Sequence, residues 1–398
     1  MKINNKIKIL IVNNNMKVGG VQKSLYNLLW TIHDEFDVTL CLFNKSGPYM
    51  NDLPPDVKVI ESNGPFRYLG ISQSECNSFL HIIKRGALAL TCKVFGRKSA
   101  LRLMLKFEHK LSGDYDCAIA YLHNGRKKSF YGGVQEYVLE CVNATRKIAA
   151  VHCDYVLCGA DNEDNNRLFE QFDAIMPCSE GCKKSFVSAM PHLVEKCVTV
   201  KNCHRFEEIR NMANTDTVNY NTDCVNLLMV SRLSHEKGID RAIKSAAKSY
   251  YNGHKIKLHI LGDGAMKQEL RSLVSELGID ENVAFYGEQS NPYRYMKNAD
   301  LLLMTSYHEA APMVIDEAVS LGLPVLTMRT TSSDEMVIDA QCGWVCENDN
   351  RSFEIALEEL LKNRELLKSA SLDLKNKIPE KNNDEAIASF CVAVTGNK

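Results

Sequence analysis

Residues 301–328 read LLLMTSYHEAAPMVIDEAVSLGLPVLTM, and this stretch decides the fold class. An apolar run at 301–305 is followed by a loop, by a segment of helical spacing at 312–321 and by a second apolar run at 324–327. The helical segment opens on Pro312, which suits the first position of a helix. Short apolar strands that alternate with helices indicate a parallel sheet covered on both faces, so the stretch predicts a strand–helix–strand unit of an α/β fold.

The same alternation extends over most of the chain in two series. The C-terminal series predicts further strands at 225–231, 256–262, 282–286 and 344–346, and helices at 240–251, 265–277, 291–297 and 353–368. The N-terminal series predicts strands at 6–12, 37–43, 115–121, 147–151, 172–176 and 198–200. Between them, residues 202–224 are polar, and we interpret them as a linker opened by a short helical stretch. We expect doubly wound domains at 1–201 and 225–381, with a C-terminal helix at about 382–398 that packs back on the first domain.

Length and composition agree with two globular domains. The 398 residues exceed the roughly 250–300 at which single cores stop growing, and 45% apolar with 24% charged residues is a globular composition. The formal net charge of −1 gives no chain-wide attraction to nucleic acid, and we expect no such partner. Fifteen cysteines without a C-x-x-C motif predict reduced, buried thiols. We find no signal peptide and no apolar run long enough to span a bilayer, so we expect a cytoplasmic protein.

One stretch, residues 82–110, is strongly basic, with eight Lys and Arg against a single acid. Lys98, Arg102, Lys106 and Lys110 are four residues apart, so on a helix they form one basic stripe. A basic amphipathic helix can lie on anionic lipid, which predicts a peripheral contact with the inner face of a membrane. The alternative is a solvated basic face over the N-terminal core.

Two carboxylates and two cations stand where strands end. Glu309 lies in the loop after a strand, and Glu317 follows it on the next helix. No Ser, Thr, Asp or Asn directly precedes Pro312 to cap this helix, so its first amides are open to an anion such as phosphate, unless the helix is simply poorly capped. Arg232 and Lys237 follow another strand of the same domain. An Arg and a Lys can neutralise a diphosphate and stabilise it as it departs, although they can equally be surface charges.

Glycine pairs follow two of the predicted strands. Gly19 and Gly20 would let the backbone approach a ligand closely at the start of the first helix. Gly262 and Gly264 follow a strand in the second domain, but Lys267 stands where a third glycine would complete a dinucleotide fingerprint. Each pair alone is equally compatible with a plain tight turn.

Four segments in order resemble the retaining GT-B-fold glycosyltransferases of group 1, also called family 4. They are GGVQKSLYNLL, VSRLSHEKGID, LHILGDG with NVAFYG, and E-x-x-PMV-x-x-E followed by AVSLGLPVL. The likeness is strong over 225–345 and thin over 57–111. It implies a GT-B fold, in which two Rossmann-like domains have parallel sheets that face each other across a cleft. The N-terminal domain would hold the acceptor and the C-terminal domain a nucleotide sugar. Gly19–Gly20, together with residues 148–155 (IAAVHCDY) and 175–180 (IMPCSE), resembles bacterial enzymes of surface-glycan synthesis.

The resemblance also implies a role for each matching residue. Glu317 would bind the ribose hydroxyls, Arg232 and Lys237 the diphosphate, and Glu309 the hydroxyls of the donor sugar. His152 matches a position where the family often has an active-site histidine, although a satisfied structural histidine would be the commoner case for this residue alone. The remaining donor contacts would come from Gly19, Gly20, Gly262, Gly287 and the amides of Met313 and Val314, with the base near Gly287 and Glu288.

Two features bear on this assignment. Ala310 and Ala311 stand where the family usually has Gly and a large aromatic residue, so the donor-sugar pocket departs from the usual pattern. Asp114 and Asp116 spell the D-x-D of metal-dependent transferases, but they open a predicted strand, and a turn before that strand is the better interpretation. The resemblance implies a metal-independent enzyme without a cofactor.

The expected activity is transfer of a hexose or N-acetylhexosamine from a nucleotide sugar, by family habit a UDP-sugar, to a glycan or lipid-linked glycan. An epimerase that acts on the nucleotide sugar alone and a non-catalytic sugar-nucleotide-binding partner of another transferase remain as alternatives. A nicotinamide-dependent dehydrogenase is disfavoured by the missing glycine fingerprint.

Overall fold

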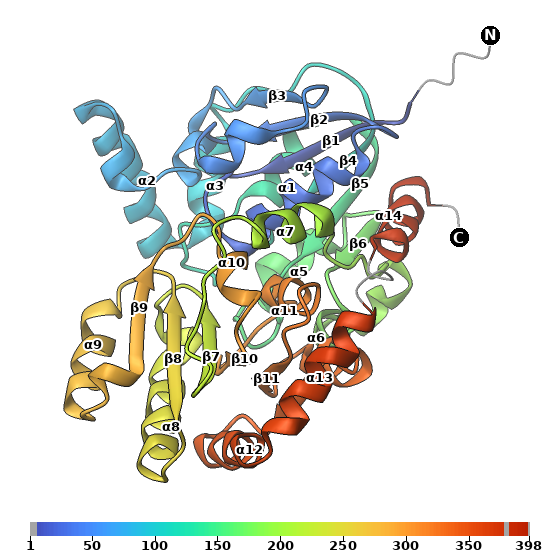
Figure 1. Ribbon diagram of the computed structural model, residues 1–398. Coiled ribbons are helices and arrows are strands. Elements are labelled where there is room, and N and C mark those ends of the chain that lie inside the picture. Colours follow the sequence, from blue (N-terminus) through green and yellow to red (C-terminus); the bar gives the residue numbers. More distant parts are fainter. Residues whose placement is uncertain (1–5, 378–381, 397–398) are drawn as a thin grey trace. The chain divides into compact units, whose positions relative to one another are not determined.

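The computed structural model describes residues 6–377 and 382–396, which form two compact units (Figure 1). The chain passes from unit 1 to unit 2 after Cys203 and returns to unit 1 at Asn383. Each unit is an α/β layer structure with a six-stranded parallel sheet. The second sheet contains the strand–helix–strand unit expected from residues 301–328, so the α/β class is confirmed.

Unit 1 has the strand order β3-β2-β1-β4-β5-β6. Its strands are β1 (Lys8–Asn13), β2 (Asp37–Leu42), β3 (Lys58–Glu61), β4 (Tyr115–Ala120), β5 (Ala144–Val151) and β6 (Ala174–Pro177). Its helices are α1 (Gly20–Ile32), α2 (Phe79–Phe95), α3 (Arg97–Leu105), α4 (Val134–Cys141), α5 (Glu163–Phe169), α6 (Glu180–Ala189) and α14 (Asp384–Thr395). Alternate residues of β1 enter two separate cores, Leu10 on one face of the sheet and Ile9 on the other, because successive side chains of a strand point to opposite faces.

Unit 2 has the order β12-β11-β10-β7-β8-β9. Its strands are β7 (Val225–Val230), β8 (Ile256–Leu261), β9 (Val283–Gly287), β10 (Leu301–Met304), β11 (Val325–Met328) and β12 (Gly343–Cys346). Its helices are α7 (Phe206–Ala213), α8 (Ile239–Tyr251), α9 (Lys267–Glu276), α10 (Tyr293–Met296), α11 (Met313–Val319), α12 (Asn350–Lys362) and α13 (Arg364–Lys377). The first strand of this unit, β7, lies between β8 and β10, so the direction of strand addition reverses between β7 and β10. Ligands of doubly wound sheets bind at such a switch point, outside the carboxyl ends of the strands.

The segment interpreted as a linker, 202–224, lies largely within unit 2. Phe206, Ile209 and Ala213 of α7 occupy one helical face and are buried in a core cluster of that unit. The burial follows from their spacing, which places apolar side chains on one side of an otherwise polar helix. At the other end of the chain, Phe390 of α14 packs edge-on against Phe36 of unit 1.

Several predicted elements differ from the structure. Strand β3 was not predicted, and 198–200 forms no strand, although Val198 and Val200 donate backbone hydrogen bonds to β6. The single helix predicted over 353–368 is two helices, because the backbone of Asn363 leaves helical geometry and its side chain accepts the amide of Leu366.

The basic stretch also folds differently from the expectation. Helix α3 ends at Leu105, and Lys106 directly after it still has helical backbone angles, so the predicted stripe of four is reduced to Lys98, Arg102 and Lys106 and Lys110 lies outside it. Among the described residues, none of the helices is both long and apolar enough to cross a membrane. All fifteen cysteines are free thiols, and ten of them are buried.

Candidate functional site

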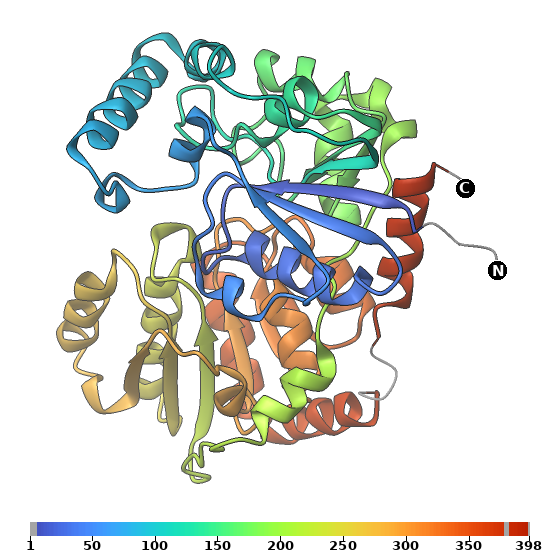
Figure 2. The same cartoon turned by 90° about the horizontal axis from the view of Figure 1, so that it is seen from above.

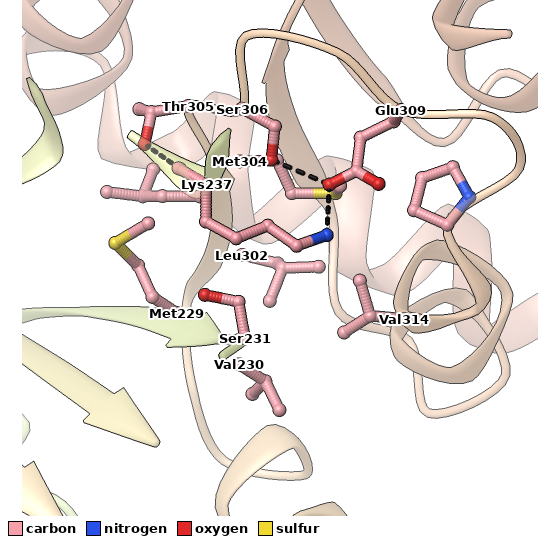
Figure 3. Close-up of a pocket in the computed structure, with 12 residues that line it drawn as sticks. Met229, Val230, Ser231, Lys237, Leu302, Met304, Thr305, Ser306, Glu309 and Val314 are labelled. Atoms are coloured by element: carbon pink, nitrogen blue, oxygen red, sulfur yellow. Dashed lines mark hydrogen bonds and ion pairs between the residues drawn. The ribbon is translucent and has the colours of Figure 1, made fainter. Parts of the chain in front are cut away.

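A small pocket opens at the switch point of unit 2, between the carboxyl ends of β7 and β10 (Figure 3). Its cavity volume is about 30 Å³. Its lining comes from the end of β7, the loop before α8, β10 with the loop that follows it, and the start of α11: Met229, Val230, Ser231, Lys237, Leu302, Leu303, Met304, Thr305, Ser306, Glu309, Pro312 and Val314. The position agrees with the general location of ligand sites in sheets of this kind.

Lys237 and Glu309, both singled out from the sequence, meet in this pocket. The Lys237 Nζ lies 2.5 Å from Glu309 Oε1, and the two side chains are 23% and 11% exposed. The Ser306 hydroxyl donates to the same carboxylate oxygen at 2.7 Å (Figure 3). The pair therefore places one cation and one anchored carboxylate at the strand ends, where the cation can exchange its carboxylate partner for a phosphate oxygen.

The loop that carries Lys237 is fixed to the end of β10 by backbone contacts. Gly238 has a φ of +57°, and a Cβ at this position would lie 2.3 Å from the Thr305 carbonyl oxygen. The Thr305 hydroxyl donates to the Gly238 carbonyl oxygen at 2.7 Å. A side chain at 238 would clash with β10, so this glycine allows the close approach that positions Lys237.

A buried arginine, Arg241, contacts the residues that follow β10. Arg241 is 3% exposed, donates to the Thr305 carbonyl oxygen at 3.2 Å and to Asn348 Oδ1 at 2.7 Å, and lies over the ring of Tyr307 at 4.6 Å. Asn348 in turn donates to the carbonyl oxygens of Ser306 and Tyr307. These supporting contacts were not predicted from the sequence. Gly238 directly after Lys237 was a readable turn signal, whereas nothing in one sequence marks Asn348 as a neighbour of residue 306.

Arg232 lies at the same edge but does not join the Lys237–Glu309 pair. Its guanidinium contacts Glu236 at 3.0 Å, and its side chain is 70% exposed. It is absent from the pocket lining given above. The structure therefore brings Lys237 and Glu309 together and leaves Arg232 on the solvent side of the loop.

Helix α11 presents the other predicted donor contacts. Pro312 precedes the helix and provides no side-chain cap, as the sequence indicated. Val314 lines the pocket, Met313 is buried, and Glu317 is buried one turn further along, at 3% exposure. The first amides of a helix have no partner within the helix, and the start of α11 reaches the pocket through Pro312 and Val314.

Gly262 and Gly287 meet at the ends of β8 and β9. The Gly262 amide donates to the Gly287 carbonyl oxygen at 2.7 Å. Gly262 has a φ of +131°, and a Cβ there would lie 1.9 Å from the carbonyl oxygen of Ser231, which lines the pocket. A Cβ on Gly287 would meet no atom within 4 Å, so the surface beside it is open.

The remaining predicted residues belong to unit 1, where parallel strands bring their carboxyl ends to one edge. Gly20 opens α1, and a Cβ on it would meet no atom within 4 Å, whereas one on Gly19 would meet the Gln22 side chain. His152 follows β5, and its Nε2 is buried without a hydrogen-bond partner among the described residues. Burial, with a smaller contribution from His123, lowers the pKa of His152 to about 3, so the ring is neutral at pH 7.

The ring of His152 packs against Tyr121, with centroids 4.7 Å apart. The Tyr121 hydroxyl is hydrogen-bonded to Ser24 on α1 at 2.8 Å. Burial also lowers the pKa of His123 to about 4, and this histidine, which follows β4, was not predicted from the sequence. Two neutral histidines thus stand after neighbouring strands of unit 1.

The D-x-D segment has structural partners at the opposite end of β4. Asp116 accepts the Lys8 amide at 2.8 Å, and Asp114 accepts the Asn143 side-chain amide at 2.6 Å. These contacts fit the interpretation as a turn followed by a strand.

The comparisons with known proteins agree with this geometry. Residues 217–376 match the family described as "Glycosyl transferases group 1". An uncharacterized glycosyltransferase of Methanocaldococcus jannaschii is 29% identical over 166 residues, 40% of each chain. The lipopolysaccharide glucosyltransferase WaaG of Escherichia coli is 35% identical over 120 residues, 30% of this chain and 32% of WaaG. The matches thus span less than half the length of these two relatives.

A third relative matches over a longer stretch. It is the N-acetylgalactosamine-N,N'-diacetylbacillosaminyl-diphospho-undecaprenol 4-alpha-N-acetylgalactosaminyltransferase of Campylobacter jejuni, 28% identical over 205 residues, 51% of this chain and 54% of that protein.

Solved structures match over nearly the whole chain. HepE of Anabaena, crystallised with UDP and glucose, has a TM-score of 0.68 at 15% identity and covers 98% of this chain and 100% of HepE. WaaG has a TM-score of 0.61 at 18% identity with the same coverage. The resemblance expected from the sequence motifs is confirmed: residues 217–376 match the group 1 glycosyl transferases, and the chain has the GT-B fold.

Proposed function

We propose that this protein is a retaining glycosyltransferase that moves a hexose or N-acetylhexosamine from a UDP-sugar to a hydroxyl of a glycan or lipid-linked glycan in surface polysaccharide synthesis. The observation that carries the proposal is the Lys237–Glu309 pair in the switch-point pocket of a group 1 glycosyl transferase segment. The relatives support the substrate classes, since HepE was crystallised with UDP and glucose and WaaG is named for lipopolysaccharide.

Donor binding would use the groups around the pocket. Lys237 would leave Glu309 for the diphosphate, and Arg232, free in solvent apart from Glu236, would turn toward the same phosphates. Glu317 on α11 would accept hydrogen bonds from the ribose hydroxyls. The first amides of that helix, at Met313 and Val314, would donate hydrogen bonds to sugar or phosphate oxygens. Glu309, released from Lys237, would then accept hydroxyls of the donor sugar.

The proposed reaction breaks the bond between the anomeric carbon and the diphosphate oxygen, and the electron pair stays on the diphosphate. The acceptor hydroxyl forms the new bond from the same face, and its proton passes to the departing phosphate oxygen. Lys237 would stabilise the negative charge that grows on the leaving group, which lowers the barrier and not only the dissociation constant. Neutral His152 can donate or accept one hydrogen bond with a sugar hydroxyl without adding charge near the anomeric carbon.

The proposal is tested by thermal shift of the purified protein with UDP, GDP, ADP and CMP and with UDP-glucose and UDP-N-acetylglucosamine. We expect UDP and a UDP-sugar to raise the melting temperature, and Glu317→Gln to abolish most of the shift. Transfer to an octyl glycoside acceptor, followed by NMR of the product, gives the anomeric configuration. An inverted product would overturn retention, and an epimerised nucleotide sugar formed without acceptor would overturn transfer.

A further inference from the structure

Helix α2 presents an apolar face to solvent. Phe79, Ile83, Leu90 and Val94 recur at helical spacing on one side of the helix and are 78%, 51%, 61% and 55% exposed. The opposite side of α2 faces unit 1 through Leu88 and Cys92, which are buried. Both views show α2 at the margin of unit 1, away from its sheet (Figure 1 and Figure 2).

An exposed stripe of large apolar side chains is unusual on a protein surface. Single exposed hydrophobic residues need no explanation, but a contiguous patch marks a contact with a partner or a membrane. Leu80 beside this stripe and Phe95 at the end of α2 extend the patch, at 57% and 73% exposure. The residues are arranged as on an amphipathic helix whose apolar side points away from the protein core.

The charged residues of α2 and α3 are all basic. Residues 79–107 contain seven Lys and Arg and no Asp or Glu, although the whole chain has a net charge of −1. Lys84 and Lys93 on α2, with Arg102 and Lys106 at and after the end of α3, are exposed and make no hydrogen bond or ion pair within the described part of the chain. Lys98 differs, since it contacts Asp164 at 3.3 Å.

We propose that the apolar face of α2, with its four unpaired cations, docks the protein on a membrane surface that carries anionic lipids. The apolar side chains would enter the boundary between headgroups and acyl chains, and the cations would meet the phosphates of the headgroups. A second copy of the chain fits the face less well, because two apposed α2 helices would bring Lys84 and Lys93 against lysines with no acid to pair them. The inference stands on this surface alone and does not depend on the identity of the donor.

The test is co-sedimentation of the full-length protein with vesicles of phosphatidylcholine alone and of phosphatidylcholine with 30% phosphatidylglycerol (about one anionic lipid in three), without any nucleotide. We expect binding to the anionic vesicles that weakens at least tenfold without phosphatidylglycerol and falls with added salt. The variant Leu90→Glu/Val94→Glu should bind at least tenfold more weakly. Leu372→Glu on α13 is the matched control, because Leu372 is 60% exposed and Leu90 61%.

A second variant separates charge from apolar contact. Lys84→Ala/Lys93→Ala should lose roughly tenfold or more in affinity for anionic vesicles and much of the salt dependence. All of these substitutions are at exposed positions, so the melting temperature should stay within a few degrees of the parent protein, which a thermal scan checks.

Three results would overturn the proposal. The first is that the parent protein does not sediment with anionic vesicles. The second is that the Leu90→Glu/Val94→Glu variant sediments with them as well as the parent protein does. The third is that the parent protein is a dimer in sedimentation velocity and this variant is a monomer, which would assign the face to self-association. Because no donor is present, these outcomes are independent of the nucleotide shifts that test the proposed function.

Discussion

Removing the ammonium group of Lys237 should slow sugar transfer while leaving the fold intact. Lys237 is the only cation among the twelve residues that line the switch-point pocket, and Glu309 is their only anion. In Lys237→Ala the pocket would carry a net charge of −1 in place of zero. A carboxylate without its partner would then face the diphosphate, and like charges at close range repel.

The size of the effect follows from this geometry. A hydrogen bond to a charged group contributes about 1.5–3 kcal/mol, and 1.36 kcal/mol corresponds to a factor of ten in rate, so the loss in kcat/KM should be roughly 10- to 150-fold. Part of the loss should appear in kcat, because the charge on the leaving oxygen grows as the glycosidic bond breaks. The unpaired Glu309 makes this range a lower estimate.

The assay is initial-rate release of UDP from the donor at saturating acceptor, with Lys244→Ala as the matched control. Lys244 lies on α8, pairs with Asp240 at 3.0 Å and does not line the pocket, so the same change of charge should leave turnover within about twofold. Equal kcat/KM for Lys237→Ala and Lys244→Ala would refute the role given to Lys237.

Further predictions concern the donor ribose, the glycine turn and pH. Glu317→Gln should raise the dissociation constant for UDP at least about tenfold, or 1.4 kcal/mol, in calorimetric titration, while Glu276→Gln on the surface of α9 should not change it. Gly262→Ala should destabilise the protein by more than about 2 kcal/mol in urea unfolding, because the new Cβ would lie 1.9 Å from the Ser231 carbonyl oxygen. Gly253→Ala is the control and should cost about 1 kcal/mol, because Gly253 has a φ of +91° but a Cβ there would meet no atom within 4 Å. Equal losses of stability in the two variants would contradict the steric argument. In the folded chain the pKa of His152 is about 3, whereas its ordinary value is 6.5. As the pH drops from about 6.5 toward 3, the unfolded state therefore binds a proton that the folded state does not, and the free energy of unfolding should fall. His152→Gln should flatten this pH dependence, and an unchanged pH profile would contradict the argument.

Much of unit 2 was predictable because its signals are local. Every strand of its sheet coincides with an apolar run bounded by Gly, Pro or polar residues. The bounds of the six predicted strands agree with those of β7 to β12 within one residue or two. The carboxyl ends of parallel strands share one edge, so the approach of Lys237 to Glu309 followed from strand order once the fold class was known.

The features that were not predicted depend on contacts between residues that are distant in sequence. Strand β3 is a four-residue edge strand, KVIE, whose apolar content is too small to stand out, and it forms by pairing with β2. Arg241 was not predicted from the sequence, because its contacts come from Thr305 and Asn348, which are distant in sequence. Leu101 and Met104, which lie among the basic residues of α3, are buried within unit 1, and the exposed apolar face belongs to α2.

The role of the Lys237–Glu309 pair is tested most directly by the position of a bound UDP-sugar in a crystal structure of the protein. We expect a diphosphate oxygen within about 3 Å of Lys237 Nζ, Glu309 no longer in contact with this lysine, and the ribose hydroxyls facing Glu317. A donor bound elsewhere, with the Lys237–Glu309 contact unbroken, would contradict it.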